Sequence, residues 1–215
     1  MSTHYKEEFF SKLLVEGNDD RHVILAICQK FNLPETFSIV DCKGVVELLK
    51  NIPIRIKLRD QYVGILIDAD TDLSARWQQL RDILIPLGYL MQNIPDESGS
   101  IFKSVSSNTV IGIWIMPNNQ VNGMLEDFAH ILIPADDVSL PYAEEALDNL
   151  ERNSVTRFSN IHRSKALIHT WLAWQESPGT PMGQAITKSY LNHNHELCIS
   201  FVDWLNRLFN PDIQI

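Results

Sequence analysis

Tyr62-Val63-Gly64-Ile65-Leu66-Ile67 is the clearest buried strand of the sequence, and it ends at Asp68-Ala69-Asp70. A short apolar run bounded by polar residues is typical of a strand that is covered on both faces of a sheet. Further strands are expected on either side of it along the chain, at residues 13–15, 37–42, 101–102 and 110–116.

Helical patterns alternate with these strands, at residues 19–31, from residue 43 to about residue 51, and at residues 72–84 and 123–132. We expect the third of these helices to stop at Pro86. Strands that alternate with helices predict an α/β fold, Rossmann-like, with a mostly parallel sheet flanked by helices.

The pattern becomes helical from about residue 141 onward, with helices expected at residues 143–150, 161–174, 182–190 and 196–209. We therefore expect an α/β core in residues 1–135 and a helical C-terminal extension in residues 136–215. The extension should pack on the core, so that the two parts form one structural unit.

The charge balance is acidic, with 18 Lys and Arg against 27 Asp and Glu and a formal charge of −9. Such a balance excludes a protein that holds nucleic acid by charge alone, because phosphate binding depends on Lys and Arg. It leaves room for a site in which divalent cations bridge carboxylates to phosphate.

The longest apolar run is Val23-Ile24-Leu25-Ala26-Ile27-Cys28, well short of the ~20 residues of a membrane-spanning helix. Residues 1–8 do not resemble a signal peptide. The three cysteines are scattered and cannot build a disulfide framework. We expect a cytoplasmic protein that does not enter the membrane.

Acidic residues follow the expected strands repeatedly. Glu16 follows the first strand, Asp68 and Asp70 follow the central one, and Asp72 comes two residues later. Because the carboxyl ends of parallel strands meet at one edge of a sheet, these carboxylates would repel one another unless a cation lies among them. Oxygen donors alone suit a hard ion, Mg²⁺ or Mn²⁺. Gly17 is expected to turn the backbone sharply and leave Glu16 projecting into the crevice.

Leu14-Val15-Glu16-Gly17, followed by Ile67-Asp68-Ala69-Asp70, resembles the Toprim domain over roughly residues 9–135. Topoisomerases, bacterial-type primases and OLD-family nucleases share this domain. The resemblance implies that Glu16, Asp68 and Asp70 bind Mg²⁺ or Mn²⁺ for phosphodiester chemistry and form the catalytic set.

The chain as a whole resembles a family of small standalone Toprim-like proteins that are known mainly from cyanobacteria. Two phrases carry this second resemblance: Trp114-Ile115-Met116-Pro117-Asn118-Asn119 and Gly123-Met124-Leu125-Glu126-Asp127-Phe128. Since OLD-type nucleases hold a second metal with further acids, the resemblance implies that role for Glu126 or Asp127. The alternative is an ordinary acidic turn of a surface helix.

Residues 153–174 contain no Asp or Glu, and His162, Lys165 and His169 would share one face of a helix there. We expect this face to contact phosphate and Lys165 to stabilise charge during cleavage. The alternative is a solvated helix face. Trp171 and Trp174 are expected in the core.

Two other sites find little support in the sequence. Asp19-Asp20 together with Asp68 suggests a phosphoacceptor receiver domain, but no lysine follows the late strand. We expect Asp19-Asp20 to complement a helix dipole, and one of them could hold a metal-bound water. Zinc at His193-Asn194-His195 is disfavoured, because this run is better placed to cap the last helix.

The sequence therefore predicts a metal-dependent enzyme that cleaves phosphodiesters in DNA or RNA, a Toprim-type nuclease. The alternative is a non-catalytic Toprim-fold module that binds nucleic acid, a nucleotide or a partner ATPase. No ATP-binding GxxxxGK[ST] motif is present, so an ATPase would have to be a separate partner. Exposed Trp204, Leu205 and Leu208 on the last helix would suit a homodimer.

Overall fold

The computed structural model describes residues 9–58 and 61–211. The expectation that residues 1–8 carry no signal peptide concerns a segment outside the described residues. Within the described ranges, no helix combines the length and the apolar character that crossing a membrane requires.

Five strands form one sheet in the order β2-β1-β3-β5-β4. Neighbouring strands run parallel except β4, which is antiparallel to β5. The expected mostly parallel α/β sheet is confirmed, and the strands lie where the apolar runs predicted them. Their bounds are β1 Lys12–Val15, β2 Ser38–Asp41, β3 Tyr62–Asp68, β4 Ser100–Lys103 and β5 Val110–Met116.

Three helices of the core lie between these strands along the chain, and a fourth follows the last strand. Their bounds are α1 Asn18–Lys30, α2 Val45–Lys57, α3 Leu73–Leu84 and, after β5, α4 Leu125–Ile131. Helix α3 stops where expected, and Pro86 lies in the short 3₁₀ helix η1 Ile85–Leu87. Helix α2 does not end near residue 51, and that expectation was wrong. It continues through Pro53, because Leu48, Ile52 and Ile56 form one buried stripe, and burial of the last two outweighs the hydrogen bond that proline cannot donate.

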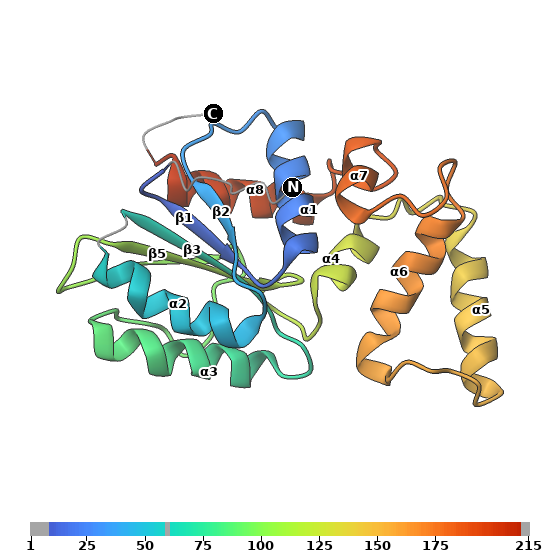
Figure 1. The fold of residues 1–215 in the computed structure, drawn as a ribbon, viewed down its shortest axis with the longest axis horizontal. Helices are drawn as coiled ribbons and strands as arrows, with labels where there is room; N and C mark the ends of the chain where they lie inside the picture. The colour runs from blue at the N-terminus through green and yellow to red at the C-terminus, as the bar shows by residue number, and fades with distance from the viewer. Residues whose placement is uncertain (1–8, 59–60, 212–215) are drawn as a thin grey trace, which may run out of the picture.

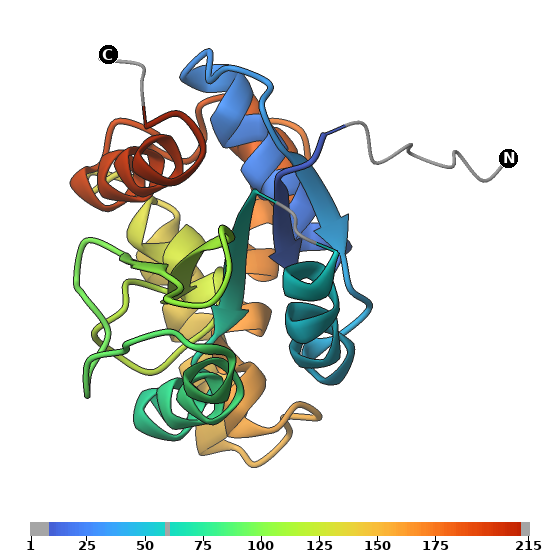
Figure 2. The ribbon, with the colours of Figure 1, turned by 90° about the vertical axis from the view of Figure 1, so that its left-hand side faces the viewer.

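Alternate side chains of the strands point to the two faces of the sheet, where they join two different hydrophobic cores. Leu13, Leu66 and Trp114 pack in the core that includes α1 and the C-terminal helix α8 Glu196–Phe209. Their neighbours Leu14 and Ile65 pack instead in the core with α2 and α3. Both faces are thus covered (Figure 1), as Figure 2 also shows in a view turned by 90°, which explains why β3 reads as a continuous apolar run.

Helix α8 lies directly on the sheet beside β3 and β5. Trp204, Leu205 and Leu208 are fully buried there, so the expectation that they form an exposed dimer surface was wrong. The sequence shows that one side of this helix is apolar, but it does not show that the sheet already covers that side. A homodimer therefore stays a prediction, and these side chains no longer support it.

Gly112 of β5 makes this close approach possible. A Cβ built at Gly112 would lie 2.4 Å from Cδ2 of Leu208, and Leu208 is fully buried. We expect Gly112→Ala to lower the free energy of unfolding by about 1–3 kcal/mol through overpacking, measured by urea unfolding. In a Leu208→Ala background the same change should cost much less. An equal cost in both backgrounds would show that the clash is not its origin.

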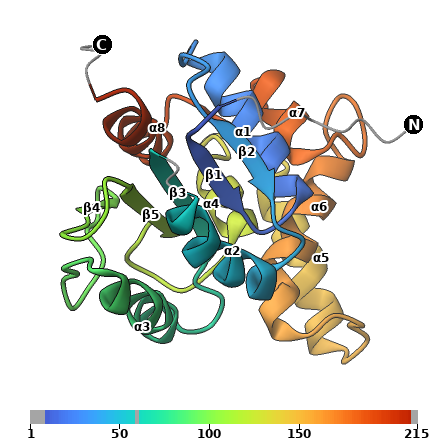
Figure 3. The same cartoon turned by 60° about the vertical axis from the view of Figure 1, so that its left-hand side comes forward.

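The remaining C-terminal helices are α5 Leu140–Arg152, η2 Asn160–His162, α6 Arg163–Ala173 and α7 Met182–Thr187. Helix α6 packs against both α4 and α5, while α7 packs against α1. Figures 1 and 3 show α5 and α6 side by side beyond one end of the sheet. Trp171 is buried as expected, but Trp174 is half exposed. The division of the chain at residue 135 stays a prediction.

Candidate functional site

A pocket of about 530 Å³ opens where β1, β2 and β3 end, and residues at the starts of α1, α4 and α6 line it as well. Its lining is dominated by carboxylates from the strand ends and the helix starts. The acids are Glu16, Asp19, Asp20, Asp41, Asp68, Asp70 and Glu126, and the basic side chains are Lys43, His162 and Lys165. We call this the acidic pocket.

Glu16 directly follows β1 and reaches across to β3. Its Oε1 accepts the backbone N–H of Asp68 at 2.9 Å. Burial raises the pKa of Glu16, while the Asp68 N–H and the charge of Arg76 partly oppose the rise. Gly17 adopts an extended φ of −146°, which any residue can adopt. The expectation that a glycine-only turn aims Glu16 was therefore wrong, and the bond to Asp68 N–H fixes the side chain instead.

Asp68 is the last residue of β3 and lies among the other acids of the acidic pocket. Its Oδ1 accepts the backbone N–H of Leu125 at 3.1 Å, at the start of α4. Burial raises its pKa well above the usual range, and the charges of the surrounding acids raise it further. Those acids are Glu16, Asp20, Glu126 and Asp70. A carboxyl in such surroundings binds a cation, whether a proton or a metal ion, more readily than an exposed one.

Asp70 is held in an unusual backbone conformation, with φ of +53°. Aspartate tolerates this left-handed region better than most residues. Its N–H donates to the carbonyl of Gly123 at 2.8 Å, and Gly123 itself has φ of +143°, where a side chain would be strained. The loop after β5 thus fixes the loop after β3.

Arg76 of α3 pairs with Asp70. This contact could not be predicted from the strand-end rule, which places acids that directly follow parallel strands at one edge of the sheet. Arg76 Nη2 lies 2.7 Å from Asp70 Oδ2, and Arg76 Nε donates to the carbonyl of Asp68 at 2.8 Å. Arg76 lies in the first turn of α3, close to the end of β3. Its partners, the Asp70 carboxylate and the Asp68 carbonyl, are known only from the structure. One guanidinium therefore neutralises Asp70 and fixes the end of β3.

Glu126 and Lys165 form an ion pair across the acidic pocket. The buried Glu126 carboxylate accepts from Lys165 Nζ at 2.9 Å, and this hydrogen bond raises the pKa of Lys165. The structure thus brings Lys165 and His162 to the acids, as the acid-free segment suggested. His169 does not line the pocket.

Asp72 and Asp127 were expected among the metal ligands, and the structure does not bring them into the acidic pocket. Asp72 caps α3, with Oδ1 accepting the N–H of Ala75 at 2.9 Å. Asp127 accepts the N–H of Met124 at 2.8 Å and also bonds the hydroxyl of Ser164. Both carboxylates are occupied as helix caps, so we leave them out of the proposed ligand set.

Asp20 is buried at the start of α1, where its Oδ2 accepts the N–H of Gly17 at 2.9 Å. The expected role at the helix N-terminus is confirmed for this residue. Burial raises the pKa of Asp20 to about 7, and the charges of Glu16 and Glu126 add to the rise. Asp19 lines the same pocket from its more exposed rim.

Asp41 and Lys43 belong to the acidic pocket and were missed in the sequence. Asp41 ends β2, so the strand-end rule that found Glu16 and Asp68 also applies to it. The two side chains form an ion pair with each other, and Lys43 has φ of +64°. The sequence feature that could have identified them is an aspartate at the end of an expected strand, with a lysine two residues later.

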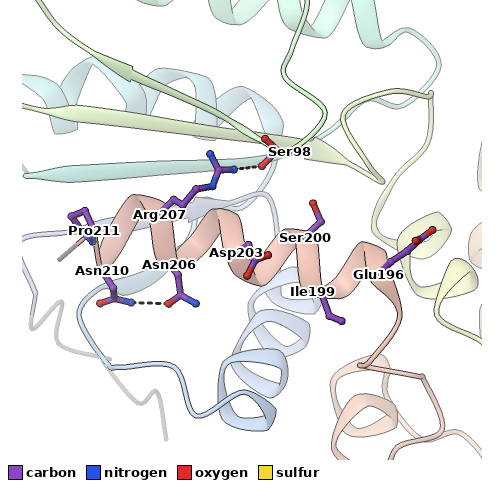
Figure 4. Close-up of a pocket in the computed structure, with 9 residues that line it drawn as sticks. All are labelled: Ser98, Glu196, Ile199, Ser200, Asp203, Asn206, Arg207, Asn210 and Pro211. Atoms are coloured by element: carbon purple, nitrogen blue, oxygen red, sulfur yellow. Dashed lines mark hydrogen bonds between the residues drawn. The ribbon is translucent and has the colours of Figure 1, made fainter. Parts of the chain in front are cut away.

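A larger groove of about 710 Å³ runs along the outer side of α8 (Figure 4). Its polar groups mostly bond to one another: Arg207 donates to the carbonyl of Ser98, and Asn210 Nδ2 donates to Asn206 Oδ1 at 3.3 Å. The groove does not gather like charges. The acidic pocket is the better candidate because its charges are both concentrated and buried.

The donor set of the acidic pocket fits a hard cation in its chemistry, since all the donors are carboxylate oxygens. Within residues 9–58 and 61–211, however, no three His, Cys, Asp or Glu side chains converge closely enough to hold one metal ion. The contacts explain why: Asp70 is turned to Arg76 and Glu126 to Lys165. A divalent ion would have to replace one of these internal cations to bind among the carboxylates.

The run His193-Asn194-His195, where the sequence disfavoured a zinc site, lies at the start of α8. His195 Nδ1 accepts the N–H of Leu197 at 3.2 Å and so caps α8. The capping role that the sequence predicted for this run is confirmed.

The fold and the acidic pocket together define the class: a mostly parallel α/β protein whose carboxylates gather at the carboxyl ends of its strands. Within that class, the chain belongs to the family described as "Protein of unknown function (DUF3226)", whose model matches residues 11–210. No curated protein and no solved structure matches the chain.

Proposed function

We propose that this chain is a metal-dependent enzyme that cleaves phosphodiester bonds in nucleic acid, of the Toprim nuclease type. Glu16, Asp68 and Asp70 would hold Mg²⁺ or Mn²⁺, and Glu126 would join them when Lys165 moves away. The observation that carries the proposal is the position of Asp68, a buried carboxyl among four others at the end of the central strand.

Clustered carboxylates cost stability through mutual repulsion, and a divalent cation removes that cost. A bound Mg²⁺ or Mn²⁺ supplies a nucleophile from water and neutralises charge on the reacting phosphate. The protein's own part is to orient the ligands: the N–H of Asp68 holds Glu16, and the N–H of Leu125 holds Asp68. Lys165 stands at the rim as the ammonium group that can meet a phosphate oxygen.

Nucleic acid is the substrate class that suits the rim. Lys43, His162 and Lys165 line the pocket beside its acids, whereas the whole chain carries a formal charge of −9. A polyanion would therefore be repelled by most of the surface and attracted where the metal and these side chains lie. We place the enzyme in the cytoplasm, because Cys28, Cys42 and Cys198 are free thiols.

The cleavage test is a panel of single- and double-stranded DNA and RNA, each incubated with Mn²⁺, Mg²⁺ or EDTA. We expect products with at least one of the two ions and none with EDTA. The identity of the substrate that is cut decides between DNA and RNA. If no substrate is cut although Mn²⁺ binds the protein, the catalytic proposal fails.

The second candidate is a non-catalytic module that binds nucleic acid, a nucleotide or a partner ATPase. One observation favours it: Asp70 and Glu126 already have internal counter-ions in Arg76 and Lys165. Such a module should bind its ligand equally well with Mg²⁺ and with EDTA, whereas the enzyme should require the ion.

A further inference from the structure

Arg76 and Lys165 are the internal cations that pair with proposed metal ligands of the acidic pocket, and they are held very differently. The Arg76 side chain is 12% exposed and has three acceptors, the Asp68 carbonyl, Asp70 Oδ2 and Gln79 Oε1. The Lys165 side chain is 48% exposed and holds Glu126 by one ion pair of 2.9 Å. Arg76 is therefore part of the framework, whereas Lys165 can leave at the cost of a single contact.

Glu126 cannot stay unpaired when Lys165 leaves. Its side chain is only 6% exposed, and a buried carboxylate without a partner is costly. A cation that arrives in the acidic pocket is the natural replacement, since Glu126 lies close enough to Asp68 for its charge to raise the pKa of that residue.

The ammonium group of Lys165 has an alternative position available when it leaves Glu126. The Cα of Lys165 belongs to α6, on the opposite side of the acidic pocket from the strand ends, and its ammonium group sits on a flexible four-carbon stem with three donors. His162, which lines the same rim, lies three residues earlier and contributes no negative charge. A released Lys165 ammonium group would therefore stay at the half-exposed rim of the acidic pocket, where a phosphate oxygen can reach it.

We propose that Lys165 is an exchangeable counter-ion: it neutralises Glu126 while no divalent cation is bound, and it turns to a phosphate oxygen of the nucleic acid when the cation replaces it. This inference rests on the proposed function, because it assumes that the acidic pocket takes a divalent ion. It also accounts for the finding that no three donors converge among the residues that the structure describes, since Glu126 is turned to Lys165.

The exchange couples the two ligands. If the ion frees Lys165 for the phosphate, then the ion must tighten binding of nucleic acid, and nucleic acid must tighten binding of the ion by the same factor. Without Lys165 the ion no longer competes with an internal cation, so the ion alone should bind more tightly and the coupling should shrink.

The test measures Mn²⁺ binding to the full chain by isothermal titration calorimetry, without nucleic acid. We expect Lys165→Met to bind Mn²⁺ roughly threefold to fivefold more tightly than wild type, the upper part of the range for an ion pair with one exposed partner. Lys165→Arg keeps the competing charge and should stay close to wild type. Lys43→Met is the matched control, because it removes the same charge from the same pocket but from Asp41, and we expect a change of at most about twofold.

A second measurement follows a short fluorescent DNA strand by anisotropy, with Ca²⁺ as the cation or with EDTA. Wild type should bind the strand more tightly with Ca²⁺, and Lys165→Met should lose most of that gain. Circular dichroism and thermal melting of each variant show that the fold is kept.

The outcomes separate the inference from the proposed function. If wild type and Lys165→Met bind Mn²⁺ equally, or if Lys43→Met tightens binding as much as Lys165→Met, the exchange is overturned while the metal site stands. If strand binding gains equally from Ca²⁺ in wild type and Lys165→Met, the phosphate half of the proposal is overturned. If neither chain binds Mn²⁺, the metal site itself is wrong and the exchange falls with it.

Discussion

Replacing Asp68 with asparagine should abolish cleavage and at the same time stabilise the ion-free protein at neutral pH. Removal of a group that merely supports a metal ligand costs about 10-fold to 100-fold, so loss of a ligand itself should lower kcat at least about 100-fold. Stability should rise because the carboxyl that burial and four neighbouring acids destabilise is gone. Steady-state cleavage and thermal melting on the same preparation measure both effects.

The opposite signs of the two effects make Asp68→Asn informative. A variant that loses activity because it unfolds would melt at a lower temperature, whereas a variant that loses a ligand should melt at the same or a higher temperature. Full turnover by a folded Asp68→Asn protein would remove Asp68 from the catalytic set, and the assignment of the acidic pocket with it.

Asp72→Asn is the matched control for this experiment. It makes the same chemical change four residues further along the chain, at a side chain that caps α3. Asparagine caps a helix about as well as aspartate, so activity and stability should both stay close to wild type. A large loss of activity in Asp72→Asn would return this residue to the ligand set.

The strand-end acids could be predicted from the sequence because one local rule finds them. Glu16 and Asp68 each follow an apolar run, and parallel strands carry their carboxyl ends to one edge. Asp72 comes after the same strand as Asp68, but it is the N-cap residue of α3, and its carboxylate accepts the N–H of Ala75. The rule gives the edge of the sheet and does not give the direction of each side chain.

The ion-pair partners of the acids could not be predicted from the sequence. Arg76 meets Asp70, and Lys165 meets Glu126, only because the folded chain brings them together. The burial of Trp204 was missed for the same reason: an apolar helix side is visible in the sequence, but the element that covers it is not. Gly64 and Gly112 are the residues that could have indicated this burial. Their lack of a side chain leaves room on the sheet for Leu208.

The stability of the ion-free protein should fall as the pH rises from about pH 5 to about pH 8. The pKa of Asp20 is raised from 3.8 to about 7, by burial first and then by the charges of Glu16 and Glu126. A carboxyl whose folded pKa is raised binds its proton more tightly in the folded chain. Its stabilising effect is therefore complete below the unfolded pKa and is lost as the pH approaches the folded one.

The expected loss between these two pH values is about 3 kcal/mol for Asp20 alone, and the raised pKa of Asp68 acts in the same direction. His193 acts in the opposite direction within this window, because burial and the charge of Lys30 lower its pKa below 6.5, so it offsets part of the loss. The lowered pKa of an aspartate acts outside the window. Hydrogen bonds from Ser98 lower the pKa of Asp96, so its contribution is lost only in more acidic solution, as the pH falls through that lowered value.

Urea unfolding at about pH 5 and about pH 8, with and without Mg²⁺, measures this dependence. Asp20→Asn should flatten the slope, whereas Asp19→Asn, at the exposed neighbouring position, should leave it unchanged. Saturating Mg²⁺ should stabilise the protein more at the higher pH, because the ion replaces protons that the acidic pocket has lost. Stability that is independent of pH in wild type would contradict the burial of charge in this pocket, since deprotonation of these carboxyls would then cost the fold nothing.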